Sequence, residues 1–255
     1  MSRYIHLLIN TVEKDLLRFT AEHFISTSVH VYDTMIDNVS VHASLESCMR
    51  ALLVATTNRH KLEELQTIFS DLPYQLLSLH DLHIDLDVEE TGTTFQENSA
   101  LKALTYARIS GVLTLADDSG LEIDALGGEP GVYSARFAGR NTPYEERFRI
   151  IYERLHAQKE LSPAPWTARF RCVMTIAEAN GYHQSVDGAL EGYVADAPRG
   201  EHGFGYDPIV YVPEFGKTCA ELEPAIKNQI SHRGVAARHA RALLESWPQS
   251  SSSHV

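Results

Sequence analysis

The sequence is short of cysteine, of basic charge and of long apolar runs, and each shortage excludes a class of protein. Its 255 residues include three cysteines that are far apart and form no Cys-x-x-Cys pair, which argues against a zinc knuckle or a disulfide scaffold. A reducing, cytoplasmic compartment fits this cysteine usage best. No run approaches the roughly 18 apolar residues that a membrane span needs, so no membrane association is expected.

Basic residues are also few, with 22 Lys and Arg against 34 Asp and Glu and a net charge of −12. This balance argues against a nucleic-acid polymer as partner, since such proteins neutralise phosphates with surplus basic side chains. A small phosphorylated ligand needs only two or three well-placed cations, so it stays compatible with an acidic chain. The 13 histidines show no His-Glu-x-x-His spacing, and no basic region followed by an apolar stretch marks a signal peptide.

Residues 1–48 differ in pattern from the rest of the chain. The stretch from 11 to 25 has the apolar spacing of one helix, and a stretch rich in Ser, Thr, His and Asp follows it. Met49 stands just before the first apolar strand, where an original start site would lie. We therefore expect an N-terminal extension of unknown role over 1–48, a main domain over 49–247 and a disordered tail over 248–255. The alternative is a packed N-terminal helix of the main domain.

From residue 51 onward, strand-like and helix-like segments alternate, and the spacing predicts an α/β protein with a long mixed β-sheet flanked by helices. Continuous apolar runs favour strands buried on both faces, a period of two appears around 170–176, and Asn180-Gly181 indicates a hairpin. Strands are expected over 51–56, 74–79, 112–116, 121–126, 170–176, 182–193 and 204–211. Helices are expected over 58–69, from 94 to about 110, from 142, and from about 230 to 247, and capping boxes open two of them at Thr94 and Thr142.

The first segment with chemical potential, Thr56 to Lys61, joins a strand end to a helix start. Backbone N–H groups at a helix N-terminus form a natural anion site, and Lys61 lies one turn inside the helix. The glycines of a Walker A loop are missing. The alternative interpretation is a structural cap by Thr57 or Asn58.

Two acidic segments are candidates for cation binding. Residues 87–92, DVEETG, would offer Mg²⁺ one carboxylate, unless they are simply a solvated acidic loop. Asp117 and Asp118 follow an apolar run that is expected to end beside them, which is the usual ligand crevice of α/β sheets. Neighbouring carboxylates there require a cation or a proton, so a metal or general-base role is favoured over a turn through Asp118-Ser-Gly.

Two later segments have the residue types of a nucleobase site. In Gly203-Phe-Gly-Tyr-Asp-Pro208 the glycines allow close approach, Phe204 offers a stacking ring and Asp207 an acceptor for a ring N–H. The alternative is a glycine-rich β-bulge with core aromatics. In 227–234, KNQISHRG, Ser231 is a helix cap, and Lys227, His232 and Arg233 bring donors for a carbonyl or phosphate. A solvated basic turn is the alternative there.

Taken in order, these segments resemble the inosine triphosphate pyrophosphatase family, the non-canonical purine NTP pyrophosphatases, over about residues 50–247. The matching segments are ATTN-RH-K (55–61), EETG-TTFQENSALKA (89–103), ADDSGLEIDALGGEPGVYSARFAG (116–139), FGYDP (204–208), KTCAEL (217–222) and K-NQI-SHRG (227–234). The resemblance implies two lobes around a central nucleotide cleft, and a homodimer. Thr57 stands where the family often has glycine or serine, and Ser99 where it commonly has alanine.

The resemblance also implies a role for each matched residue. Asp118 would be the general base or a metal ligand, supported by Asp117, and Glu90 would help to hold Mg²⁺. Substrate binding would involve the phosphate loop, two further lysines and the base site, that is Thr56, Thr57, Asn58, Arg59, His60, Lys61, Lys102, Ser119, Phe204, Gly205, Tyr206, Asp207, Lys227, His232 and Arg233.

The implied reaction is metal-assisted hydrolysis of ITP, dITP or XTP to the monophosphate and pyrophosphate. The 6-keto oxygen of the purine would meet His232, Arg233 or backbone N–H groups, which the 6-amino group of adenine cannot satisfy. One alternative is a related pyrophosphatase for pyrimidine or modified nucleotides. Another is a non-catalytic nucleotide-binding module.

Overall fold

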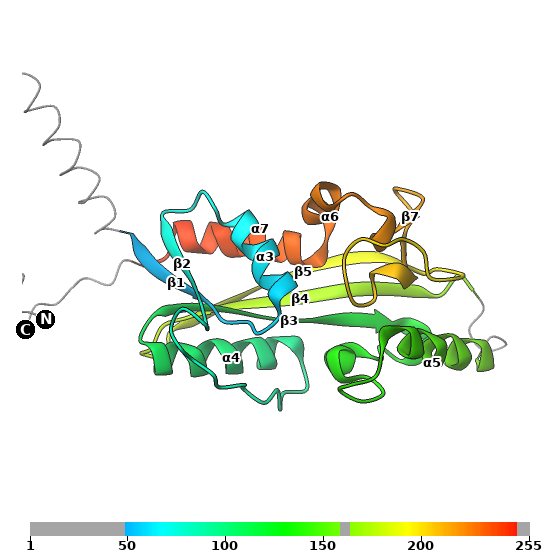
Figure 1. Cartoon of the computed structure of the whole chain (residues 1–255), viewed down its shortest axis with the longest axis horizontal. Coiled ribbons are helices and arrows are strands. Elements are labelled where there is room, and N and C mark those ends of the chain that lie inside the picture. The colour runs from blue at the N-terminus through cyan, green and yellow to red at the C-terminus, as the bar shows by residue number, and fades with distance from the viewer. Residues whose placement is uncertain (1–48, 159–163, 249–255) are drawn as a thin grey trace, which may run out of the picture. The chain divides into compact units, whose positions relative to one another are not determined.

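The computed structural model describes residues 49–158 and 164–248, so the predictions for 1–48 and for 249–255 lie outside the described residues. One mixed sheet of seven strands, in the order β2-β1-β3-β4-β5-β6-β7, forms the centre of the fold (Figure 1). The predicted α/β class with a long mixed sheet is confirmed. In the described part of the chain, no helix is both long and apolar enough to cross a membrane.

The first half of the sheet is parallel, because a helix separates each pair of strands and returns the chain to the same edge. β1 pairs in parallel with β2 on one side and β3 on the other. These elements are β1 (Arg50–Val54), α3 (Arg59–Ile68), β2 (Tyr74–Ser78), α4 (Phe95–Ser110) and β3 (Leu113–Ile123).

The second half is antiparallel, and the predicted hairpin at Asn180-Gly181 joins its two longest strands. Gly181 has φ +96°, a conformation that favours glycine. The elements are α5 (Tyr144–Ala157), β4 (Thr167–Ala177), β5 (His183–Val194), β6 (Val210–Val212), β7 (Lys217–Thr218), α6 (Pro224–Ile230) and α7 (His232–Glu245).

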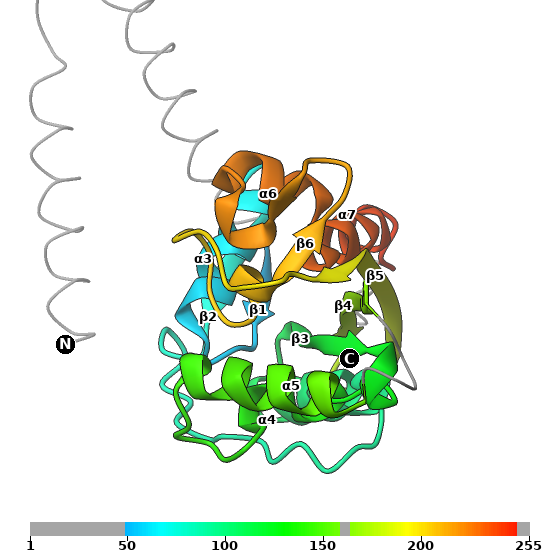
Figure 2. The ribbon, with the colours of Figure 1, turned by 90° about the vertical axis from the view of Figure 1, so that its right-hand side faces the viewer.

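Helices cover both faces of the sheet. α3, α6 and α7 lie on one face, and α4 and α5 lie on the other (Figures 1 and 2). Apolar residues of α3 and α7, such as Leu65 and Ala237, pack with Leu115 and Met174 of the sheet in one core cluster. Ala103 of α4 belongs to a cluster on the other side. The burial of both faces explains the continuous apolar runs of the strands.

Polar caps begin the helices that carry site residues. Asn58 caps α3 by accepting from the N–H groups of His60 and Lys61. The structural cap by Asn58 that the sequence left open is therefore present, and it occupies two of the N–H groups at this helix start. The predicted capping box of α4 is present at Thr94, and Ser231 caps α7 as expected.

The prediction of two separate strands over 112–116 and 121–126 is wrong. β3 runs unbroken from 113 to 123, because the antiparallel partner β4 pairs with it from Thr114 to Ile123. Asp117 and Asp118 therefore lie in the middle of a strand and not at its carboxyl end. β1 ends at Val54, opposite Leu115, so the edge of β3 beyond Leu115 lies free of β1 and borders the site.

Three further boundaries differ from the prediction. The capping box at Thr142 is absent, because the Thr142 hydroxyl donates to the carbonyl of Ala138. The strand expected over 204–211 shrinks to β6, since glycines at positive φ turn the chain before it. The helix expected from about 230 to 247 is α7, and the separate helix α6 before it was not predicted; Ser231 at φ −63° and ψ 152° separates the two.

Replacing Gly188 with Ala is expected to destabilise the fold, because β5 and α7 touch there through backbone. A Cβ at Gly188 would lie 2.4 Å from the carbonyl oxygen of His232 and 2.6 Å from the amide nitrogen of Ala236. Such overpacking typically costs about 1–3 kcal/mol. Urea unfolding of Gly188→Ala should show this loss, and the exposed neighbour Ala189→Ser should unfold like the wild type. An undiminished stability would contradict the contact.

Candidate active site

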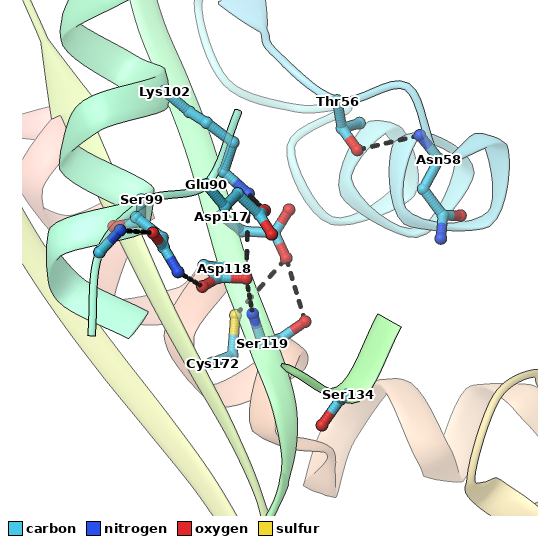
Figure 3. Close-up of polar contacts among 12 residues, drawn as sticks. Thr56, Asn58, Glu90, Ser99, Lys102, Asp117, Asp118, Ser119, Ser134 and Cys172 are labelled. Carbon is cyan, nitrogen blue, oxygen red and sulfur yellow. Dashed lines mark hydrogen bonds and ion pairs between the residues drawn. The ribbon is translucent and has the colours of Figure 1, made fainter. Parts of the chain in front are cut away.

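The two adjacent aspartates of β3 face opposite sides of the sheet, because successive side chains of a strand alternate. Asp117 points to the layer of α3 and α7, where it meets Lys61 and Arg233. Asp118 points to α4, where it meets Asn98 (Figure 3). The strand thus separates two carboxylates that the sequence places side by side, and each has its own partners.

Asp117 is the centre of a buried ionic cluster. Its Oδ2 lies 2.8 Å from Lys61 Nζ and 3.6 Å from Arg233 Nε. Ser119 Oγ donates to the same oxygen at 3.4 Å, and the Cys172 thiol lies 3.9 Å away. Burial raises the pKa of Asp117, but Lys61 and Arg233 outweigh burial and hold this pKa well below its usual range. Asp117 therefore stays ionised and holds these two cations at the site.

Asp118 has a different environment. Its Oδ2 accepts from Asn98 Nδ2 at 3.0 Å, its Oδ1 accepts from the Ser119 backbone N–H at 2.9 Å, and Lys102 Nζ lies 3.9 Å from Oδ1. Burial raises the pKa of Asp118 above its usual range, and Lys102 offsets only part of this effect. A carboxylate with a raised pKa is a stronger base, which suits proton abstraction from a water.

Glu90 lies in the irregular segment before α4 and shares a cation with Asp118. Lys102 Nζ is 2.6 Å from Glu90 Oε1, and Arg136 Nη1 is 2.8 Å from Oε2. Burial raises the pKa of Glu90, but Lys102 and Arg136 together lower it below its usual range. Lys102 therefore stands between the two carboxylates that the family resemblance assigns to the metal.

These two carboxylates fit a magnesium ion. Mg²⁺ is commonly bound by one or two carboxylates together with water and substrate phosphates. In the described residues, no group of three His, Cys, Asp or Glu side chains is placed to hold a metal. Glu90 and Asp118 offer hard oxygen ligands on either side of one ammonium group, so substrate oxygens would have to complete the coordination.

A cavity of about 350 Å³ collects most of the predicted phosphate ligands. Its charged lining consists of four cations and two carboxylates, a surplus of positive charge in an acidic protein. The lining residues are Ala55, Thr56, Thr57, Asn58, Lys61, Asp87, Val88, Glu90, Lys102, Tyr106, Ala135, Arg136 and Arg140. Thr57, which stands where the family often has glycine or serine, is an exposed residue of this lining.

A second cavity of about 110 Å³ adjoins the first, because Asn58, Lys61 and Glu90 line both. It brings the predicted base-site residues to Asp118. Those residues are Ser119, Phe204, Gly205, Tyr206, Asp207, Lys227, His232 and Arg233. Arg59 and His60 line neither cavity. Arg59 pairs with Glu63 on the surface, and His60 stacks on Phe204 with ring centroids 5.3 Å apart.

The base-site cations are held by carboxylates rather than solvated. Lys227 Nζ lies 2.7 Å from Asp207 Oδ2, which also accepts from the Phe204 backbone N–H. Arg233 Nη1 donates to Glu64 at 2.8 Å, and Arg233 Nη2 donates to Ser119 Oγ at 3.0 Å. The solvated basic turn that the sequence left open is therefore wrong, since both cations are buried.

His232 is buried beside these cations. Its ring stacks on Phe170 at 4.8 Å, and its Nδ1 has no hydrogen-bond partner among the described residues. Burial, then Arg233 and Lys227, lower the pKa of His232 well below its usual range. The imidazole is therefore neutral, with one N–H donor and one acceptor nitrogen for a ligand.

Sequence reasoning missed two functional contacts and left one unused. Glu64 lies one turn after Lys61 on α3, so helical spacing would have placed it at the site. Asn98 lies four residues before Lys102, so helical spacing places both on one face of α4, but no role was assigned to it. Arg136 had no local signal, since only the folded chain brings it to Glu90. Ser99 lies away from the cavities, within 2.5 Å of the Thr175 hydroxyl, which explains how serine fits at a family alanine position.

This geometry defines a class of protein, an α/β fold in which a cation-lined cavity adjoins an aromatic-lined cavity that holds a carboxylate with a raised pKa. The model of the Ham1 family matches residues 52–243, and the chain belongs to this family.

Curated relatives cover most of the chain. The chain is 45% identical over 196 residues to the dITP/XTP pyrophosphatase of Desulforamulus reducens (76% of this chain, 94% of the relative). It is 46% identical over 200 residues to that of Geobacter sulfurreducens (77% and 96%). A solved HAM1 protein from Coxiella burnetii is 40% identical with TM-score 0.71 and covers 78% of this chain and 100% of its own. The solved Ham1 protein of Staphylococcus aureus is 39% identical with TM-score 0.69, and the match covers 78% of this chain and 100% of that protein.

Lowering the pH is expected to destabilise the protein through His232. The native side chain stays neutral, whereas the unfolded one binds a proton below its ordinary pKa of about 6.5, so the free energy of unfolding falls as pH drops below that value. Between pH 7.5 and 5.5 this contribution is about 1.4 kcal/mol. Urea titrations should show a smaller loss for His232→Gln than for the wild type, and equal losses would contradict the prediction.

Proposed function

We propose that this chain hydrolyses the non-canonical purine triphosphates ITP, dITP and XTP to the monophosphate and pyrophosphate, and so removes them from the nucleotide pool. The observation that carries the proposal is that Asp118 lines the cavity of Phe204 and His232, which adjoins a cationic cavity lined by Lys102, the neighbour of Asp118. The curated relatives named dITP/XTP pyrophosphatases support it.

In the proposed reaction Asp118 accepts a proton from a water molecule, whose oxygen attacks the α-phosphorus. The bond between this phosphorus and the oxygen bridging to the β-phosphate breaks, and pyrophosphate leaves. Lys61 and Lys102, both lining the phosphate cavity, offset the charge that develops on the leaving group. Asn98 holds one oxygen of Asp118 and so orients the base.

We propose Mg²⁺ as the cofactor, held by Glu90 and Asp118 together with substrate oxygens. When bound, it supplies positive charge to the phosphates. The charge of the phosphate cavity supports this choice, because its four cations and two carboxylates leave two positive charges, fewer than the four negative charges of a triphosphate. Thr56, Thr57 and Asn58 complete the phosphate side of the cavity.

For base recognition we propose stacking on Phe204 and a hydrogen bond from His232. Arg233 Nη1 and Nη2 donate to Glu64 and Ser119, whereas His232 Nδ1 has no partner among the described residues, so we assign the 6-keto oxygen to His232. With adenine the N–H donor of His232 would face the 6-amino group, which is itself a donor. A site built on a specific hydrogen bond discriminates strongly against a substrate that cannot form it.

We further propose that the enzyme is a cytoplasmic homodimer and that residues 49–247 carry its activity. Cys172 and Cys219 are buried free thiols, as expected in a reducing compartment. A cavity of about 620 Å³ between β4, β5 and the 127–133 segment forms a face with an exposed Tyr133 and would accept the same face of a second copy.

The activity is tested by pyrophosphate release from a nucleotide panel in Mg²⁺. We expect turnover of ITP, dITP and XTP and little from ATP, GTP, UTP or dTTP. Asp118→Asn should lose at least about 100-fold in kcat, because general-base catalysis contributes about that much. The exposed neighbour of a proposed metal ligand, Glu89→Gln, should keep wild-type activity.

Three results would contradict this function. Equal turnover of all purine triphosphates would remove the base selectivity, and turnover of pyrimidine nucleotides would indicate a related pyrophosphatase. Nucleotide binding without turnover would indicate a binding module. An active Asp118→Asn protein would refute the role of Asp118.

Light scattering tests the dimer. The wild-type chain should have twice the protomer mass, and Tyr133→Asp should shift it to the monomer, because the charge would be buried at the interface. Ile109→Asp, an exposed apolar residue of α4 outside this face, is the control. A chain beginning at Met49 should match the full chain in mass and kcat/KM, and loss of either would show that residues 1–48 contribute.

A further inference from the structure

Arg136 holds Glu90 at two points. Its Nη1 donates to Glu90 Oε2 at 2.8 Å, and its Nη2 donates to the main-chain carbonyl of Glu90 at 3.2 Å. Lys102 Nζ contacts the other carboxylate oxygen, Oε1, at 2.6 Å. One guanidinium thus sets both the path of the main chain and the orientation of the carboxylate.

Glu90 needs such support, because it lies between two distant anchors of an irregular segment. Before it, the Tyr106 hydroxyl donates to the carbonyl of Leu86 at 2.7 Å. After it, the amide of Gly92 donates to Asn98 Oδ1 at 2.8 Å. Between these anchors the side chain of Glu90 contacts only Lys102 and Arg136 among the described ion pairs. A lysine is a single point charge, so it cannot fix the plane of a carboxylate as a planar guanidinium does.

Arg136 is itself well placed for this task. It ends the short 3-10 helix Gly131–Arg136, which packs closely on β3, since a Cβ at Gly120 would lie 2.4 Å from the Gly131 carbonyl oxygen. Its guanidinium also lies 5.1 Å from the centroid of the Tyr133 ring. Because this helix packs on β3, where Asp118 lies, it fixes the position of Arg136 and so the position of Glu90 relative to Asp118.

We propose that Arg136 is a positioning residue for cation binding, which binds Oε2 of Glu90 and leaves Oε1 with Lys102, on the side of Asp118 where the divalent ion would bind. This inference rests on the proposed function. It predicts that removing the positive charge of Arg136 weakens the binding of the divalent cation, whereas simple charge repulsion would predict tighter binding. Groups that hydrogen-bond to a metal ligand typically change metal affinity or activity by roughly 10–100-fold when removed.

The test is Mn²⁺ binding by electron paramagnetic resonance, with the full chain alone and with ITP whose α–β bridging oxygen is replaced by CH₂. Arg136→Gln should raise the Kd for Mn²⁺ by about tenfold or more. Arg108→Gln is the matched control, since Arg108 is an exposed arginine of α4 that lines neither cavity and makes no ion pair with Glu90 in the described residues. Removing its charge should leave the Kd unchanged or lower it.

Arg136→Lys keeps the charge, but a lysine can bind only one of the two oxygens that Arg136 binds, Oε2 and the main-chain carbonyl oxygen of Glu90. The Kd of this variant for Mn²⁺ should therefore lie between those of the wild type and Arg136→Gln. This variant carries the test if Arg136→Gln does not fold. In turnover assays the Mg²⁺ concentration for half-maximal rate should rise in Arg136→Gln, while the rate at saturating Mg²⁺ recovers.

An unchanged or lower Kd in both Arg136 variants would overturn the proposal. The proposed hydrolysis would then still stand if the wild type cleaves ITP. Conversely, a wild type that cleaves no triphosphate would remove the proposed function, and the Mn²⁺ titration would still report the effect of Arg136 on cation binding.

Discussion

The alternation of side chains along β3 is the constraint on which the site depends. It sends two adjacent carboxylates to opposite faces of one strand, so that Asp117 binds the cations of α3 and α7 while Asp118 faces α4. Had both pointed the same way, their charges would compete for the same cations and couple their titration. The pleat therefore gives one carboxylate a structural role and leaves the other available for chemistry.

The buried ion pairs around Asp117 maintain this division. Removing one member of such a buried pair typically costs about 3–5 kcal/mol, because the remaining charge is left without compensation. A connected series of such pairs links β3, α3 and α7, and it runs from Lys61 through Asp117 and Arg233 to Glu64. The series joins the phosphate cavity to the base cavity, so a shift of α3 would alter both. The preference for an ionised Asp117 and the raised pKa of Asp118 both follow from this arrangement.

Local signals in the sequence located most of the elements and the general position of the site. The capping residues Thr94 and Ser231 and the Asn180-Gly181 hairpin act over a few residues, so their patterns could be interpreted without a partner. The errors came where a distant segment intervenes. Pairing with β4 continues β3 through Asp117 and Asp118. The Thr142 hydroxyl, which a capping box would need, donates instead to the carbonyl of Ala138.

The sequence by itself determined the α/β class, the segments that carry chemistry and the family to which they point, because these depend on spacing and residue type along the chain. Only the tertiary structure decided which residues act together. It separated Asp117 from Asp118, brought Glu64 to Arg233, and brought Arg136 to Glu90 across 46 positions. The physical reason is that ion pairs and pKa values depend on distance and burial in the folded chain, which the spacing of residues along the sequence does not specify.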